Sequence, residues 1–190
     1  MDSFNTAIKD KREYSGLNLK EFEPITKINL RGKKREFFTK VGQALSVILP
    51  MESNTSAGNQ ELSALWLSPD EWMIYTNNKN NEIFDRVFKE ISSLNYGAVT
   101  NVSDQWVCIN ISGDKLYELL SMSCPFNFTK FKEIKGSTTQ TIINHIDVII
   151  HNLGDNNINL FVRRSFSNHL WDWLNAVSYT HLRAHETWSY

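Results

Sequence analysis

The run from Ala98 to Phe126 constrains the fold more than any other stretch, because turn residues divide its apolar segments. One β-favouring segment precedes the polar pair Asp104-Gln105, and a second apolar segment of strand length runs from Trp106 to Ile111. Gly113 ends that segment, and leucines at helical spacing then continue to a stop at Cys124-Pro125. The run therefore predicts a strand, a corner, a second strand, a tight turn and a short helix.

Strands and helices alternate along the rest of the chain as well. The apolar patterns predict strands at residues 25–30, 64–67, 72–75, 138–143, 146–150 and 158–163, and helices at 34–48, around 83–94 and from Ser165 or Ser167 onward. We expect Ser112 to N-cap the short helix of the central run. Three strand-to-helix corners joined by hairpins predict an α+β fold with ferredoxin-like split β-α-β units.

The chain is expected to contain one folded domain with two flanking segments. Residues 1–23 are charged and weakly patterned, so we expect a loose N-terminal arm there. Residues 24–176 carry the predicted elements and form the α+β domain. Residues 177–190 begin with VSYTHLRAHET, which reads as a translated sequencing-library adapter, and we expect this segment not to be native. That interpretation is favoured over a metal site at His181 and His185, although their spacing would allow one on a helix.

Composition and charge restrict the compartment and the classes of partner. The 190 residues carry a net charge of −1, which favours neither a nucleic acid nor an anionic membrane as partner. The two cysteines make no disulfide framework, no secretory signal is recognisable, and no apolar run approaches the roughly 20 residues of a membrane span. We therefore expect a cytoplasmic chain that binds neither nucleic acid nor membrane.

The usual motifs for nucleotides, metals and nucleophilic catalysis are missing from the sequence. It contains no Rossmann fingerprint, P-loop, Cys-x-x-Cys, His-Glu-x-x-His or Gly-x-Ser-x-Gly pattern. Cys124 could be a nucleophile with His145 or His169 as its base, but a buried packing role is favoured. His145 and His151 could form a metal pair on one strand face, but water-exposed strand ends are favoured. We therefore predict no catalytic, cofactor-binding or metal-binding residue on this chain.

Acidic, aromatic and basic side chains remain as candidates for binding. The adjacent acids Asp70-Glu71 are expected in a solvated turn, and Asp104 is expected to bond backbone amides in a corner. The tryptophans are expected in the core or at a protein interface. We assign a possible partner interface to Trp106, Arg163 and Arg164, because an arginine pair could contact a carboxylate, a phosphate or a partner protein.

Three segments together resemble the gamma subunit family of heterotetrameric sarcosine oxidase. They are LWLSPDEWMIY (Leu65–Tyr75), VTNVSDQWVCINISGDKLYELLSMSCPFNF with the downstream TTQTIINHIDVIIH (Val99–Phe128 and Thr138–His151), and NLFVRRSFSNHLWDWL (Asn159–Leu174). Their order and spacing match the family as well, so the resemblance covers about residues 25–176. The Asn-rich corner before the strand that ends at Arg163 departs from the family pattern.

The resemblance implies a function within an assembly. The family's complex oxidises sarcosine to glycine, passing electrons through flavins to oxygen and the one-carbon unit to tetrahydrofolate. The flavins, NAD, zinc and tetrahydrofolate are implied on the other subunits. The gamma chain is implied to be a non-catalytic structural subunit packed on the alpha subunit, with beta and delta subunits in the same complex. Its implied fold is similar to the folate-binding-type domain of glycine-cleavage aminomethyltransferase.

Two alternative functions stay open at this point. A folate-dependent, aminomethyltransferase-like one-carbon enzyme would need a carboxylate placed for a pterin, and Asp104 is the candidate for it. A stand-alone binding module would use the corner at Arg163 and Arg164. Titration of the isolated chain with tetrahydrofolate separates the first alternative from a structural subunit, which would not bind it.

Overall fold

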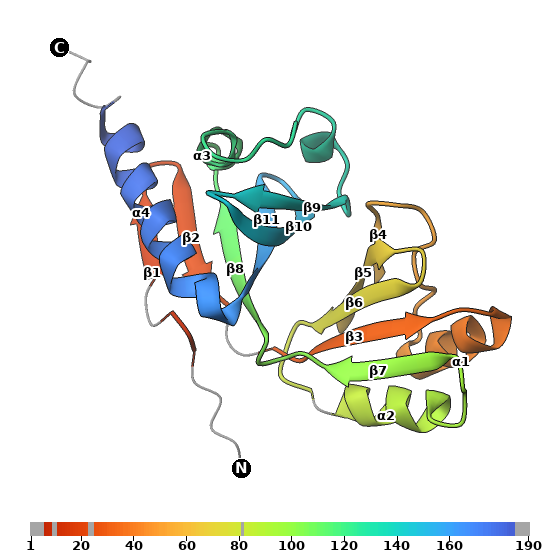
Figure 1. The fold of residues 1–190 in the computed structure, drawn as a ribbon. Helices are drawn as coiled ribbons and strands as arrows, with labels where there is room; N and C mark the ends of the chain where they lie inside the picture. Colours follow the sequence, from red (N-terminus) through yellow and green to blue (C-terminus); the bar gives the residue numbers. More distant parts are fainter. Residues whose placement is uncertain (1–5, 9–10, 23–24, 81, 185–190) are drawn as a thin grey trace. The chain divides into compact units, whose positions relative to one another are not determined.

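The computed structural model describes residues 6–8, 11–22, 25–80 and 82–184, with side chains as far as residue 180. These residues form two compact units (Figure 1). Unit 1 takes the described residues up to 22, residues 106–135 and those from 139 onward, and unit 2 takes the described residues among 23–105 and 136–138. The boundary between Gln105 and Trp106 falls inside the central run, so its two strands belong to different units.

Unit 2 has the ferredoxin-like split β-α-β arrangement that the sequence predicts. Its elements are β3 (Lys27–Gly32), α1 (Arg35–Leu45), β4 (Ser56–Gly58), β5 (Leu62–Ser68), β6 (Glu71–Thr76), α2 (Glu82–Ile91) and β7 (Gly97–Asn101). The strand order is β4-β5-β6-β3-β7, and each neighbouring pair is antiparallel. Strand β6 thus lies between β3 and β5, which precede and follow α1 in the chain.

The core of unit 2 lies between its two helices and one face of its sheet. Buried side chains of α1 and α2 pack against those of β3, β5 and β6. The fully buried ring of Phe37 lies over two paired glycines, since a Cβ on Gly32 or Gly97 would come within 2.5 or 2.8 Å of that ring. Helix α1 ends at Leu45, earlier than predicted, because Ser46 takes a left-handed conformation at φ 53°.

Unit 1 is built on a six-stranded antiparallel sheet. Its elements are β1 (Lys11–Tyr14), β2 (Leu17–Glu21), β8 (Trp106–Ser112), α3 (Leu116–Ser121), η1 (Phe131–Glu133), β9 (Thr138–Ile143), β10 (Ile146–Gly154), β11 (Asn157–Arg163), η2 (Arg164–Phe166) and α4 (Ser167–Ala184). The strand order β1-β2-β8-β11-β10-β9 makes the last three strands a meander. The core packs buried side chains of α3 and α4 against those of β2, β8, β10 and β11.

The N-terminal segment contributes two strands to the sheet of unit 1. The expectation of a loose arm over residues 1–23 is therefore wrong for Lys11–Glu21. In β2 the buried side chains of Leu17 and Leu19 alternate with polar ones, as on a strand with one face in the core. Strand β2 pairs with β8, the second strand of the central run, and so becomes an inner strand of the sheet.

The short helix α3 lacks the predicted cap. It begins after Lys115 and no side chain caps its first turn, so the prediction that Ser112 is its N-cap is wrong. The turn is made by Gly113 at φ 125°, whose N–H donates to the Asn156 carbonyl oxygen (2.9 Å). The Lys115 N–H donates to the Gly16 carbonyl oxygen (3.1 Å). These bonds join the turn before α3 to the β1–β2 and β10–β11 turns.

The last helix continues past the start of the segment that we expect not to be native. Helix α4 runs to Ala184, whereas that segment begins at Val177. The alternative metal pair of His181 and His185 lies outside the described side chains. Among the helices that the structure describes, none is long and apolar enough to cross a lipid bilayer.

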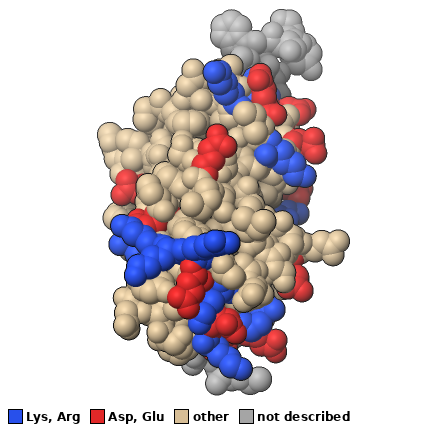
Figure 2. Space-filling model, turned by 90° about the vertical axis from the view of Figure 1, so that its right-hand side faces the viewer, with Lys and Arg blue, Asp and Glu red and all other residues tan. Residues whose placement is uncertain are grey.

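The surface drawn in Figure 2 carries acidic and basic side chains interspersed among uncharged ones. Arg31 and Glu71 form an ion pair at 2.5 Å, and Lys33 lies 3.3 Å from Asp70. These pairs neutralise charges where β3 meets the turn between β5 and β6. The positive charges of Arg31 and Lys33 are therefore each paired with a carboxylate of this turn.

Candidate functional site

The two histidines near the β9–β10 hairpin occupy different environments. His145 is exposed at the turn, where Asn144 and His145 both take positive φ, and His151 is buried in β10 opposite Asn159. The favoured water-exposed environment is confirmed for His145 and wrong for His151. Burial lowers the pKa of the His151 imidazole to about 4. Within the described residues, no three His, Cys, Asp or Glu side chains are grouped to hold a metal ion.

Because the His151 imidazole is buried and neutral, we expect acid to destabilise the fold. The pKa of His151 is about 4 in the folded state and 6.5 in the unfolded chain, so between these values only the unfolded chain binds the proton. The free energy of unfolding therefore rises with pH across this window and falls on acidification, by at most about 3 kcal/mol. Urea denaturation at a series of pH values between 7 and about 4.5 measures this slope.

Two histidine variants separate this effect from the titration of carboxylates. His151→Gln should flatten the slope between about pH 6.5 and 4.5, because it removes the group that the folded state keeps neutral. His145→Asn should retain the slope, because it changes an exposed imidazole at a left-handed position that Asn tolerates. Equal slopes in the wild type and His151→Gln would contradict a buried neutral imidazole.

Cys124 and Asp70, two candidates for a chemical role in the sequence, are held by core packing and by local polar contacts respectively. Cys124 is buried in the core of unit 1, which confirms the predicted packing position, and its Sγ lies 3.5 Å from Thr141 Oγ1. Asp70 accepts a hydrogen bond from the Ser68 hydroxyl (2.9 Å) and lies 3.3 Å from Lys33 Nζ. These two partners, the hydroxyl first, hold the pKa of the Asp70 carboxyl below its ordinary value.

Glu71 joins β6 to β3 through its carboxylate. Burial alone would raise the pKa of Glu71, but hydrogen bonds from Arg31 (2.5 Å) and Asn29 (2.7 Å) outweigh it, and the pKa is lowered. The residues Asp70 and Glu71 are thus not a bare solvated turn, because each carboxylate has a basic partner. Both groups stay ionised at neutral pH and fasten the β5–β6 turn to β3.

Asp104 lies exposed in the turn that precedes β8. Within the described residues its carboxylate makes no hydrogen bond, so the prediction that it bonds backbone amides in this corner is wrong. That bonding is done by Asn101, whose Oδ1 accepts a hydrogen bond from the Ser103 N–H (3.0 Å). The Asx-type turn is thus made by Asn101, three positions before Asp104, and the Asp104 carboxylate faces solvent.

The predicted interface residues Trp106 and Arg163 meet at the end of the β8–β11 pair. The two strands are antiparallel with Trp106 opposite Arg163, and the guanidinium carbon lies 4.3 Å from the centroid of the indole ring. This is a cation–π contact between an exposed arginine and a half-buried tryptophan. Arg164 follows at the start of η2 and is also exposed. All three predicted residues therefore lie around the junction of β11 with η2.

Phe166 adds an apolar side chain to this junction. It ends η2 and is 51% exposed. The buried Ser167 fixes the turn, because its hydroxyl donates to the Arg164 carbonyl oxygen (2.8 Å). A phenylalanine between two serines after an arginine pair, in RRSFS, was the sequence signal that could have identified it. We call the four residues Trp106, Arg163, Arg164 and Phe166 the arginine corner.

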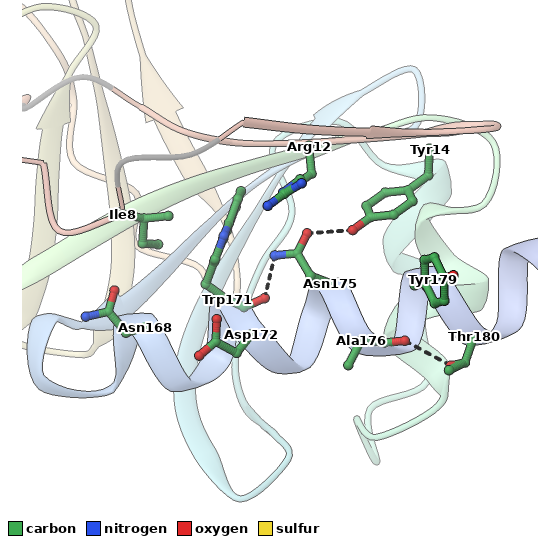
Figure 3. A pocket seen from close by; sticks show the side chains of 10 residues that line it. All are labelled: Ile8, Arg12, Tyr14, Asn168, Trp171, Asp172, Asn175, Ala176, Tyr179 and Thr180. Atoms are coloured by element: carbon green, nitrogen blue, oxygen red, sulfur yellow. Dashed lines mark hydrogen bonds between the residues drawn. The ribbon is translucent and has the colours of Figure 1, made fainter.

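A hollow of about 600 Å³ lies between β1 and α4 in unit 1 (Figure 3). The Tyr14 hydroxyl donates to Asn175 Oδ1 (2.7 Å), and Asn175 Nδ2 donates to the Trp171 carbonyl oxygen (2.8 Å). Two lining residues, Tyr179 and Thr180, belong to the segment expected not to be native. The sequence did not predict the hollow, because β1 was assigned to a loose arm. The lining residues are Ile8, Arg12, Tyr14, Asn168, Trp171, Asp172, Asn175, Ala176, Tyr179 and Thr180.

A family model and two solved structures are similar to this chain. The model described as "Sarcosine oxidase, gamma subunit family" matches residues 32–180. A heterotetrameric sarcosine oxidase from Corynebacterium sp. U-96, in complex with pyrrole 2-carboxylate, is similar with a TM-score of 0.80 and 22% identity over 85% of this chain and 83% of that chain. A search of the curated proteins found no match.

The second structure is the glycine cleavage system aminomethyltransferase T from Bartonella henselae. It is similar with a TM-score of 0.63 and 14% identity over 84% of this chain and 45% of that chain. The chain thus spans less than half of that enzyme. The similarity confirms the α+β fold class and the expected likeness to the aminomethyltransferase fold.

Proposed function

The chain belongs to the sarcosine oxidase gamma subunit family, and from this premise we propose that it is a non-catalytic structural subunit of a heterotetrameric sarcosine oxidase. In this proposal the complex oxidises sarcosine to glycine, transfers the one-carbon unit to tetrahydrofolate and passes the electrons to oxygen. The chain contacts the alpha subunit directly and shares the cytoplasmic complex with the beta and delta subunits. The flavins, NAD, zinc and tetrahydrofolate are held by those other subunits.

The family match over residues 32–180 carries this proposal. The contacts of the candidate reactive groups support a structural role as well. Asp70 and Glu71 bind basic side chains of their own unit, and Cys124 packs in a core. In the arginine corner, in contrast, Arg163, Arg164 and Phe166 are exposed to solvent. Arginine and phenylalanine are residue types that are enriched at protein interfaces.

The fold similarity to an aminomethyltransferase favours a second candidate function, a folate-dependent one-carbon enzyme. In that case the Asp104 carboxylate, which is exposed, would contact the pterin. The structural role is the better supported of the two, because the family match carries it and Asp104 lies on an open turn.

One experiment with the purified chain tests both functions. We expect the isolated chain to be colourless, to give no sarcosine-dependent oxygen consumption, and to show no heat signal on titration with tetrahydrofolate. The assembled complex, assayed in parallel as the positive control, should be coloured, consume oxygen when sarcosine is added, and give a heat signal on titration with tetrahydrofolate. Saturable tetrahydrofolate binding by the isolated chain, lost in Asp104→Asn, would replace the structural role with the one-carbon enzyme.

A further inference from the structure

We infer that the arginine corner is where this chain docks an acidic segment of a partner subunit, with a carboxylate against Arg163 and an apolar side chain against Phe166. This inference rests on the proposed function, because it specifies the chemistry of one contact within the assembly. The occupant is a protein segment in which Asp or Glu lies close to an apolar residue.

The position of Arg163 prepares its guanidinium for a carboxylate. One side of the group lies over the Trp106 ring at 4.3 Å, and the N–H donors spread from the rim of the planar group. In the described residues Arg163 forms no ion pair, so these donors remain available to a ligand. A carboxylate can therefore bind through two parallel hydrogen bonds, the geometry in which arginine exceeds lysine.

The contact with Trp106 also lowers the entropic cost of binding. A long arginine side chain that is free in solution loses rotamer freedom when it is fixed in an interface. Here the indole ring already restrains the side chain, and cross-strand pairing of Trp106 with Arg163 fixes the two backbones. The Arg163 side chain therefore loses less conformational entropy when the partner binds.

Phe166 and Arg164 determine the kind of partner that fits beside this anion site. A phenyl ring that is 51% exposed gains by burial against an apolar side chain, which a free phosphate or small anion does not offer. Two exposed arginines favour negative charge on the opposing surface. A nucleic acid is disfavoured because the chain as a whole carries a net charge of −1. An acidic, partly apolar protein segment would both bury the Phe166 ring and place negative charge opposite the two arginines.

The test compares charge reversal at the corner with the same change elsewhere. The probe is the purified alpha subunit of a sarcosine oxidase, and its dissociation constant is measured for the full chain. Arg163→Glu should weaken binding at least about tenfold, because it removes a bidentate contact and opposes the carboxylate. Arg163→Lys should weaken it less. Arg86→Glu, on the exposed face of α2 in unit 2, is the matched control and should leave binding within about twofold.

The outcomes separate this inference from the proposed function. If the wild-type chain binds none of the alpha, beta and delta subunits, the proposed function fails. If it binds and Arg163→Glu equals Arg86→Glu, only the inference is overturned. It is also overturned if the wild type, but not Arg163→Glu, retains a nucleic acid while subunit binding is unchanged. A photo-crosslinking residue at position 166 should capture a partner peptide that contains Asp or Glu, and capture of a peptide without either contradicts the acidic segment.

Discussion

Replacing Gly113 by alanine should destabilise unit 1 by more than about 4 kcal/mol in the free energy of unfolding. Gly113 takes φ 125°, a conformation that residues with a Cβ rarely adopt. A Cβ built there would lie 2.2 Å from the Gly16 carbonyl oxygen and 2.8 Å from its carbon. These atoms are backbone of the β1–β2 turn, so they cannot rotate away as a side chain would. Relief requires displacement of β2 from β8.

Urea denaturation and amide hydrogen exchange measure the effect of Gly113→Ala. Exchange should accelerate in β2 and β8, the two strands that the clash separates. Gly42→Ala is the matched control, because Gly42 lies inside α1 and its added Cβ would meet only the Val47 carbonyl oxygen at 3.6 Å. That variant should be more stable by about 0.5–1 kcal/mol, since alanine favours a helix interior. A Gly113→Ala chain as stable as the wild type would contradict the turn geometry.

Trp72→Ala should be the most damaging single truncation in unit 2, with a loss of about 3–5 kcal/mol. The Trp72 side chain is fully buried, and its indole N–H donates to the Pro50 carbonyl oxygen (2.8 Å). The Phe38 ring meets it edge to face with centroids 5.4 Å apart, and the Phe37 ring lies 6.2 Å away. Truncation leaves a cavity among these rings and removes the partner of a carbonyl group.

Two further substitutions make the Trp72 prediction specific. Trp72→Phe fills much of the cavity but loses the indole donor, so its loss should be about half that of Trp72→Ala. Trp66→Ala removes the half-buried cross-strand neighbour and should cost less than either change at Trp72. Denaturation of the three variants gives this order directly. A Trp66→Ala loss larger than that of Trp72→Ala would contradict the placement of Trp72 in the core.

Local sequence patterns predicted the elements of the central run and those of unit 2 other than β4 (Ser56–Gly58). The apolar segment from Trp106 to Ile111 forms β8, and the hairpin around Asp70-Glu71 joins β5 to β6. These elements follow from hydrophobic periodicity and turn residues that lie within a few positions of one another. Leu17 and Leu19 carried the same two-residue period, but the charged residues around them concealed the β1–β2 hairpin.

Long-range packing decided the features that the sequence did not predict. The contact between Trp106 and Arg163 depends on the register of β8 against β11, two strands far apart in the chain. The sequence pattern placed both residues in a possible partner interface but did not predict that their side chains contact each other. His145 lies in the turn just before β10 and His151 lies within β10, and only tertiary packing determines that His151 is buried. The exposure of Phe166 likewise depends on where η2 ends and α4 begins.

Membership in a sarcosine oxidase assembly, which we propose for this chain, can be tested on the intact complex. The test is native mass spectrometry of the complex purified through a tag on this chain, after co-expression with alpha, beta and delta subunits. We expect a mass that corresponds to all four chains, and a smaller assembly with the other three when the gene for this chain is omitted. Recovery of the tagged chain alone, beside an active sarcosine oxidase that lacks it, would contradict the claim.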